Sequence, residues 1–167
     1  GTAGGDIRLY LEADGQVRVN MGAPQLQPQR IPFQADRRAE SYWLEVDGER
    51  HEIGAISMGN PHAVLQVQST EDAPLQRLGP RIEHHPRFPR RTNVGFMAVR
   101  ARDQIDLRVF ERGAGETLAC GSGATTAACA ALAPSAARCW RPAARPRAWG
   151  VASRSQRGAR GRAGRAG

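Results

Sequence analysis

The stretch with the clearest chemical potential centres on Cys120, which is followed by Gly-Ser-Gly and then by a run rich in Ala and Thr. Such a run predicts a helix that begins at the cysteine. A thiol at a helix N-terminus is biased toward the thiolate, because free backbone N–H groups and the helix dipole favour negative charge there. Gly121 and Gly123 leave those amides uncovered, as in sites that hold a carboxylate or phosphate. The stretch therefore predicts a base beside an anion-binding turn.

A second pair of polar residues, Glu111 and Arg112, closes a strand-like run at residues 105–110. Side chains alternate along a strand, so Glu111 shares one face with Ile105, Leu107 and Val109. An unpaired buried charge is costly. A carboxylate at the end of an apolar row is therefore either paired or functional.

Further candidates stand at other strand ends, and each also has a plainer interpretation. Asn60 and His62 lie in a Met-Gly-Asn-Pro-His break, and Asn93 precedes a strand. The two Asn are equally typical of turn capping, and His62 of a turn. Arg112 is equally consistent with a surface charge. A free Cys such as Cys120 is often a small buried hydrophobe.

The elements that must position these residues read as an α+β fold. Asp-Gly pairs at residues 14–15 and 47–48 predict two hairpins and an antiparallel sheet. Strands are expected at residues 7–11, 17–21, 42–46, 52–57, 63–67, 94–99 and 105–110, and a loop at 23–40. Ser69 and Gly79 bracket a helix of about two turns. The nearly uncharged helix after Cys120 is expected to be buried, with the sheet around it.

Composition divides the chain into two parts. Residues 1–132 hold 15 Arg and 16 acidic residues, whereas residues 133–167 hold 9 Arg and no acid. The formal charge of +8 therefore belongs to the tail. Three Cys without regular spacing indicate a reducing, cytoplasmic setting. The sequence has no transmembrane run, and no Cys or His spacing typical of zinc ligands, so no metal is expected.

The tail at residues 133–167 admits two interpretations. It lacks Leu, Ile, Phe and Met beyond residue 133, and so cannot bury enough apolar area to fold. Arg/Gly-rich segments bind RNA. An Ala/Arg/Gly/Pro/Ser mixture that starts inside a helix is also what a GC-rich gene gives when it is read out of frame, and this second interpretation is favoured.

Four motifs resemble those of the diaminopimelate epimerase family, in the family's order. They are VNMGAP (residues 19–24), MGNPHAV (58–64), RTNVGF (91–96) and ERGAGETLACGSGA (111–124). The resemblance covers roughly residues 2–132. A single Cys-Gly-Ser-Gly would be a weak match, but four ordered motifs are specific.

The resemblance implies a fold and an activity. The fold is α+β, built from two similar halves, each a mostly antiparallel curled sheet wrapped around a central helix. The activity is a cofactor-independent interconversion of LL- and meso-2,6-diaminopimelate, on the route to lysine and peptidoglycan. Two cysteines, one from each half, face opposite sides of the substrate's α-carbon. The family resemblance also implies a cytoplasmic homodimer that needs neither membrane nor nucleic acid.

The resemblance also assigns roles to the residues named above. Cys120 corresponds to the second catalytic cysteine, and His62 and Glu111 correspond to positions that tune the cysteine pair. The substrate-binding positions correspond to Asn60, Asn93, Glu111, Arg112, Gly121 and Ser122.

The sequence departs from the family pattern at both ends. No Cys-Gly-Asn-Gly motif for the first cysteine is present. We therefore expect residues 1–22 to form a hairpin near a domain boundary, residues 23–132 an incomplete C-terminal half-domain and residues 133–167 a disordered tail, and this chain alone to be inactive. Two alternatives are a proline racemase-like enzyme of the same fold and a non-enzymatic, RNA-binding fragment.

Overall fold

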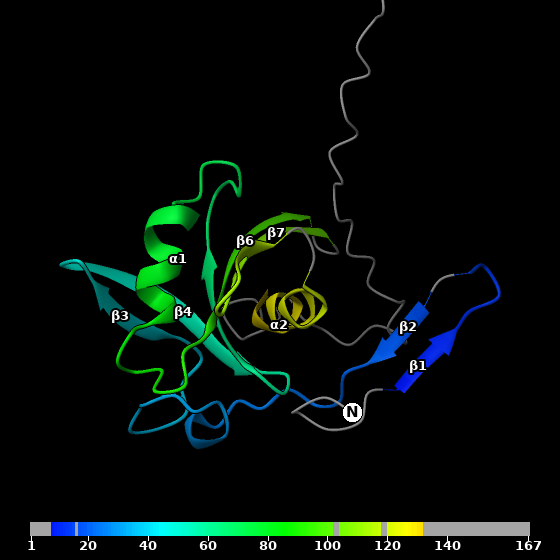
Figure 1. Cartoon of the computed structure of the whole chain (residues 1–167), viewed down its shortest axis with the longest axis horizontal. Helices are drawn as coiled ribbons and strands as arrows, with labels where there is room; N and C mark the ends of the chain where they lie inside the picture. The colour runs from blue at the N-terminus through cyan, green and yellow to red at the C-terminus, as the bar shows by residue number, and fades with distance from the viewer. Residues whose placement is uncertain (1–7, 16, 102–103, 118–119, 132–167) are drawn as a thin grey trace, which may run out of the picture.

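The computed structural model describes residues 8–15, 17–101, 104–117 and 120–131. Within these residues a six-stranded sheet runs in the order β3-β4-β5-β6-β7-β8 (Figure 1). Its strands are β3 (Tyr42–Val46), β4 (Glu49–Ser57), β5 (Pro61–Gln66), β6 (Asn93–Ala101), β7 (Gln104–Glu111) and β8 (Gly115–Thr117). The fold is α+β, as predicted. The predicted tail at residues 133–167 lies outside the described residues.

Both predicted hairpins are present. The strands β1 (Arg8–Leu11) and β2 (Val17–Asn20) pair antiparallel in a separate two-stranded sheet. In the hairpin of β3 and β4, Asp47 and Gly48 have φ values of 52° and 80°. Two successive residues with positive φ are what a two-residue turn needs to match the twist of its strands. The Asp-Gly signal was therefore a reliable local one.

The sheet is mixed rather than purely antiparallel, because β5 and β6 pair in parallel. A parallel pair needs a long crossover connection, and the chain supplies it through the helix α1 (Leu75–Glu83) between the two strands. The other pairs along the sheet are antiparallel. The prediction of a mostly antiparallel sheet is thus confirmed, and the parallel pair is a correction to it.

The predicted bounds of α1 are wrong. Ser69 does not begin the helix; its hydroxyl accepts the Glu71 amide at 3.2 Å in a local turn, and the helix starts at Leu75. Gly79 and Pro80 do not end it either. A Cβ on Gly79 would lie 2.7 Å from the Phe110 ring, so this glycine permits close packing on β7. Pro80 has no backbone N–H to donate, but the helix tolerates this missing donor and continues to Glu83.

Two helices lie on opposite faces of the sheet (Figure 1). The helix α1 packs Leu75, Leu78 and Ile82 onto one face, in a core that includes Ile31 and Phe33 of the loop around the short 3-10 helix η1 (Pro28–Arg30). The helix α2 (Gly121–Ala131) buries Ala127 on the other face with Val64 and Met97. Strand β5 is therefore buried on both sides, as central strands are.

The lack of charged residues in α2 predicted a helix that is buried all round. The structure shows that it is not. Gly123, Thr126 and Ala127 form a buried stripe, whereas Ala124 and Ala128 are half-exposed. The described structure packs a single layer, strands β4 to β7, against this helix. A small, uncharged side chain is compatible with either environment, so composition alone could not fix the burial.

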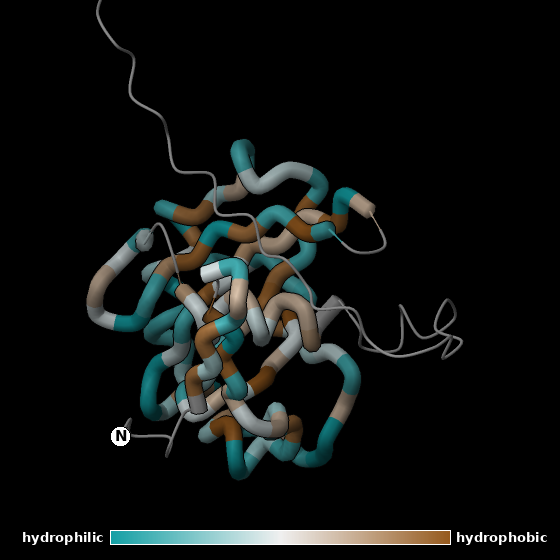
Figure 2. The backbone as a smooth tube through the Cα atoms, turned by 90° about the vertical axis from the view of Figure 1, so that its right-hand side faces the viewer, coloured by the Kyte–Doolittle hydropathy of each residue, from teal (hydrophilic) through white to brown (hydrophobic). Residues whose placement is uncertain are grey.

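Side chains from the loop after α1 cover the outer edge of β3. Arg87 donates to the carbonyl of Trp43 at 2.9 Å, and the His85 ring lies 3.1 Å from the carbonyl of Glu45. Arg87 also lies over the Phe33 ring at 4.4 Å. An uncovered strand edge is a template for aggregation. At this edge, two of the outward carbonyls already have partners. Along the backbone, hydrophobic and hydrophilic residues alternate over short stretches (Figure 2).

Candidate functional site

Cys120 stands immediately before α2, as predicted, and its thiol acts as the helix cap. The amide of Gly123 donates to Sγ at 3.3 Å, and the Ala124 amide donates to the Cys120 carbonyl at 2.9 Å. This is the arrangement in which an N-cap side chain satisfies one of the free amides of the first turn. The sulfur is therefore held at the positive end of the helix dipole.

The two glycines of this turn differ in what they permit. A Cβ on Gly123 would lie 3.0 Å from Cγ2 of Val109 and 3.2 Å from Sγ of Cys120, so a side chain there would press on the thiol. A Cβ on Gly121 would meet nothing within 4 Å. Gly121 is exposed, and this side of the turn is open to an approaching anion. Ser122 is half-buried beside it.

Three polar side chains, those of Asn60, Asn93 and Ser122, meet around the ring of His62. We call these four residues the His62 cluster. Nε2 of His62 lies 3.1 Å from Oδ1 of Asn60, 3.2 Å from Oγ of Ser122 and 3.4 Å from Nδ2 of Asn93. Ser122 Oγ in turn lies 3.5 Å from the Cys120 sulfur. A continuous polar path therefore links the thiol to the imidazole.

The sheet topology explains how this cluster forms. His62 and Asn93 are Cα partners in the parallel pair of β5 and β6, near the starts of both strands. The helix α2 packs over these strands and brings Ser122 onto His62. The crossover through α1 thus places residues that are far apart in sequence side by side.

His62 is uncharged at neutral pH. Only 1% of the residue is exposed. Burial, with a smaller contribution from the positive charge of Arg112, lowers the pKa of His62 from 6.5 to about 4. Burial has this effect because the protonated ring loses its hydration. A neutral imidazole accepts or donates one hydrogen bond at Nε2, according to its tautomer, and so is suited to orient Ser122 or Asn60.

Asn93 connects this cluster to the end of β7. Its Oδ1 accepts the Arg112 amide at 2.9 Å, and its Nδ2 donates to the carbonyl of Pro61 at 3.1 Å. The guanidinium of Arg112 donates to the carbonyl of Arg90 at 2.9 Å. Arg112 as a whole is exposed. Arg112 is therefore anchored at its backbone while its side chain stays at the surface.

Glu111 is half-buried at the end of β7, and its carboxylate accepts the hydroxyl of Thr117 at 2.6 Å. This partly buried, partnered state agrees with its predicted place at the end of the apolar row. Sequence reasoning did not predict β8, the short strand that supplies Thr117. It also did not single out Glu83, whose carboxylate accepts the Gly113 amide at 2.9 Å.

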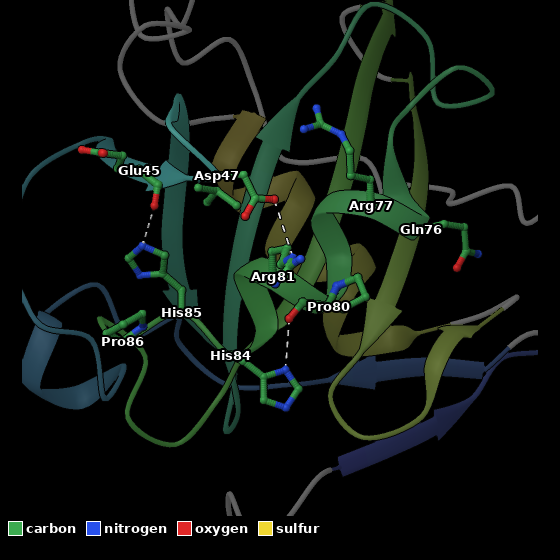
Figure 3. A pocket seen from close by; sticks show the side chains of 10 residues that line it. Glu45, Asp47, Gln76, Arg77, Pro80, Arg81, His84, His85 and Pro86 are labelled. Atoms are coloured by element: carbon green, nitrogen blue, oxygen red, sulfur yellow. Dashed lines mark hydrogen bonds and ion pairs between the residues drawn. The ribbon is translucent and has the colours of Figure 1, made fainter.

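A hollow in the described surface lies away from these residues. It is lined by α1 and by the turn after β3, where Arg81 faces Asp47 and His85 faces the carbonyl of Glu45 (Figure 3). None of the candidate residues lines it. Most of its side chains are at least partly exposed, and the contacts across it are an ion pair and a hydrogen bond within the fold. His84 is exposed. The candidate residues lie instead around Cys120 and in the His62 cluster.

Among the described residues, no group of three or more His, Cys, Asp or Glu side chains is placed to bind a metal ion. In the same part of the chain, no helix combines the length and the apolar character needed to cross a membrane. Cys129, on α2, is half-buried, and burial raises the pKa of its thiol.

Comparison with protein families decides where the chain belongs. A model of the family described as "Diaminopimelate epimerase" matches residues 54–141, which is just over half of the 167 residues. The chain belongs to the diaminopimelate epimerase family. The match includes β5, β6 and β7, and with them the residues of the His62 cluster and Cys120.

Curated relatives carry the same name. A diaminopimelate epimerase of Stutzerimonas stutzeri (strain A1501) is 63% identical over 131 residues, covering 78% of this chain and 48% of that protein. One from Pseudomonas syringae pv. tomato is 59% identical over 131 residues, with the same two coverages of 78% and 48%. One from Thioalkalivibrio sulfidiphilus is 61% identical over 126 residues, or 75% of this chain and 45% of that protein. This epimerase-family chain thus spans about half the length of the curated relatives it matches.

Proposed function

We propose that this chain supplies one wall of a cofactor-independent diaminopimelate epimerase site, which interconverts LL- and meso-2,6-diaminopimelate. The observation that carries the proposal is the meeting of three sequence motifs at Cys120. The first motif contributes Asn60 and His62, the second Asn93 and the third Ser122. These side chains converge beside one capped thiol. The names of the relatives supply the substrate.

In the proposed reaction, a cysteine thiolate removes the α-proton of the substrate. The electron pair of the broken C–H bond moves into the α-carboxylate, and a second cysteine thiol on the opposite face donates a proton to the α-carbon. The centre is inverted, and the two cysteines exchange protonation states. Fixed dipoles aimed at the carboxylate stabilise the charge that develops in this step. Cys120 is proposed as one of the two cysteines.

We assign the remaining roles from the resemblance to the family's motifs. The exposed turn of Gly121 and Ser122 offers backbone amides to the reacting carboxylate. Asn60 and Asn93 bind substrate from the neighbouring strand ends, and Glu111 and Arg112 hold the distal amino-acid end. The neutral ring of His62, 3.2 Å from Ser122, tunes Cys120 through that hydroxyl, and Glu111 tunes the pair from the other side.

We propose that this wall needs a second wall to act. A second cysteine motif of the family type is absent from the sequence, so residues 23–132 act as a C-terminal half-domain with residues 1–22 near its boundary. The finer family architecture, in which each sheet curls around its central helix, belongs to this proposal, as do homodimerisation and a cytoplasmic location. Residues 133–167 are proposed to be foreign to the fold.

Exchange of the substrate α-proton in deuterated water tests the proposal. We define the completed chain as this chain joined in frame to the first half of the Stutzerimonas stutzeri relative. The completed chain should exchange and epimerise LL-diaminopimelate, Cys120→Ala should abolish both, and Cys129→Ala on the same helix should retain them. This chain alone should show neither. Unchanged exchange in the Cys120→Ala variant would refute the role of Cys120.

A further inference from the structure

The carboxylate of Glu83 is the one buried acidic group among the described residues that the roles above leave unused. Glu83 is the last residue of α1 and is only 4% exposed. The C-terminal end of a helix carries partial negative charge, which disfavours a carboxylate there. Burial adds the loss of hydration. A residue that opposes both preferences indicates a specific contact that requires it.

The contacts of Glu83 identify that requirement. Its Oε1 accepts the amide of Gly113 at 2.9 Å, and the guanidinium of Arg91 lies 3.9 Å from the same oxygen. Its Oε2 lies 3.7 Å from Nδ1 of His84. The backbone carbonyl of Glu83 accepts the amide of Thr92 at 3.2 Å. One residue thus ties the end of α1 to the start of β6 and to the turn after β7.

That turn follows Glu111 directly, and each of its amides is held. The amides of residues 112–114 donate in order to Oδ1 of Asn93 at 2.9 Å, to Oε1 of Glu83 at 2.9 Å and to the carbonyl of Glu111 at 3.1 Å. Two of these three acceptors are buried side chains from other elements. A hydrogen bond to a carboxylate is roughly twice as strong as a neutral one, so Glu83 is the strongest of these restraints.

We propose that Glu83 is a positioning residue, whose carboxylate fixes the turn at residues 111–114 and thereby the direction in which Glu111 and Arg112 face the substrate. The loop that follows Glu83 also holds the Arg112 guanidinium, through the carbonyl of Arg90 at 2.9 Å. The restraint on the turn stands on the contacts alone. Its consequence for catalysis rests on the proposed function.

Amide hydrogen exchange on this chain tests the restraint. In Glu83→Ala, exchange at residues 112 and 113 should rise about 10-fold or more while the amides of β4 and β5 stay protected, because local opening and global unfolding are separable by exchange. Glu83→Gln keeps an acceptor oxygen and should retain most of the protection. Glu49→Ala, which removes an exposed carboxylate, is the matched control. Unchanged exchange at residue 113, or an equal rise across the whole sheet, would overturn the proposal.

Kinetics on the completed chain test the consequence. Misplacing a substrate-positioning group costs about 10- to 100-fold, so Glu83→Ala should lower kcat/KM for diaminopimelate by that factor, with a larger change in KM than in kcat. Glu83→Gln should recover much of the loss, whereas a purely structural role would give no such split. A kcat/KM equal to that of the parent overturns the catalytic part. A completed parent chain without turnover overturns the proposed function instead, and the exchange result still decides the restraint.

Discussion

Acidification from pH 7.5 to pH 5 is expected to destabilise this fold through His62. The pKa of His62 is about 4 in the folded chain and 6.5 without burial. Between these values the unfolded chain binds one proton more than the folded chain, so the free energy of unfolding falls as the pH is lowered. The loss begins near pH 6.5 and is complete near pH 4.

The size of the effect follows from the two pKa values. A difference of one pKa unit corresponds to about 1.4 kcal/mol, so the full loss is about 3 kcal/mol. About 2 kcal/mol of it falls between pH 7.5 and pH 5. This window separates His62 from the pair of Arg108 and Glu116. Arg108 holds the pKa of Glu116 below its ordinary value of 4.5, so the stability from that pair is lost only at lower pH.

Urea unfolding followed by circular dichroism at half-unit steps from pH 7.5 to pH 5 measures the slope. The His62→Gln variant should lose it, whatever its absolute stability, because the titrating ring is gone. If His62→Gln and the parent lose the same free energy over this window, the burial of a neutral His62 is refuted.

Two further substitutions test the packing that supports the site. Gly79→Ala should destabilise the chain by about 1–3 kcal/mol through overpacking on Phe110, which outweighs the gain of about 1 kcal/mol in helix propensity. Phe110→Leu in the same chain should relieve the loss. A Gly79→Ala variant more stable than the parent would contradict the reasoning. Arg87→Ala should cost about 2–4 kcal/mol, since it removes charged hydrogen bonds to the carbonyls of Gln34 and Trp43 and a cation–π contact with Phe33. Arg87→Lys should recover less than half of that, and a loss below about 0.5 kcal/mol for Arg87→Ala, typical of a surface change, would contradict the contacts.

Features set by neighbours in sequence were predictable. Asp-Gly turns gave both hairpins, and alternation along residues 105–110 placed Glu111 beside an apolar row. The glycine-flanked Cys120 was correctly placed at a helix start. Each of these signals depends on a few adjacent residues, and the structure has the predicted turn, strand or helix start at each of them.

Features set by distant partners were not predictable from one sequence. The bounds of α1 depend on how closely Gly79 approaches Phe110, which overrides the usual meaning of Gly-Pro as a stop. The burial of α2 depends on how many layers pack against it. The contact between Glu83 and Gly113 spans 30 residues and follows no period. An acidic residue at a helix C-terminus was the available signal, and it reads as unfavourable until its partner is known.

The long connections within the His62 cluster have a consequence for the order of folding. His62 meets Asn93 across 31 residues and Ser122 across 60, whereas each hairpin closes over a few residues. Loop closure must precede such contacts, so non-local pairings form slowly. The hairpins are therefore expected early, the crossover through α1 next, and the seating of α2 last. A substitution that slows this last step would reduce the fraction of chains in which the His62 cluster forms, while each chain that does form it would have the parent arrangement.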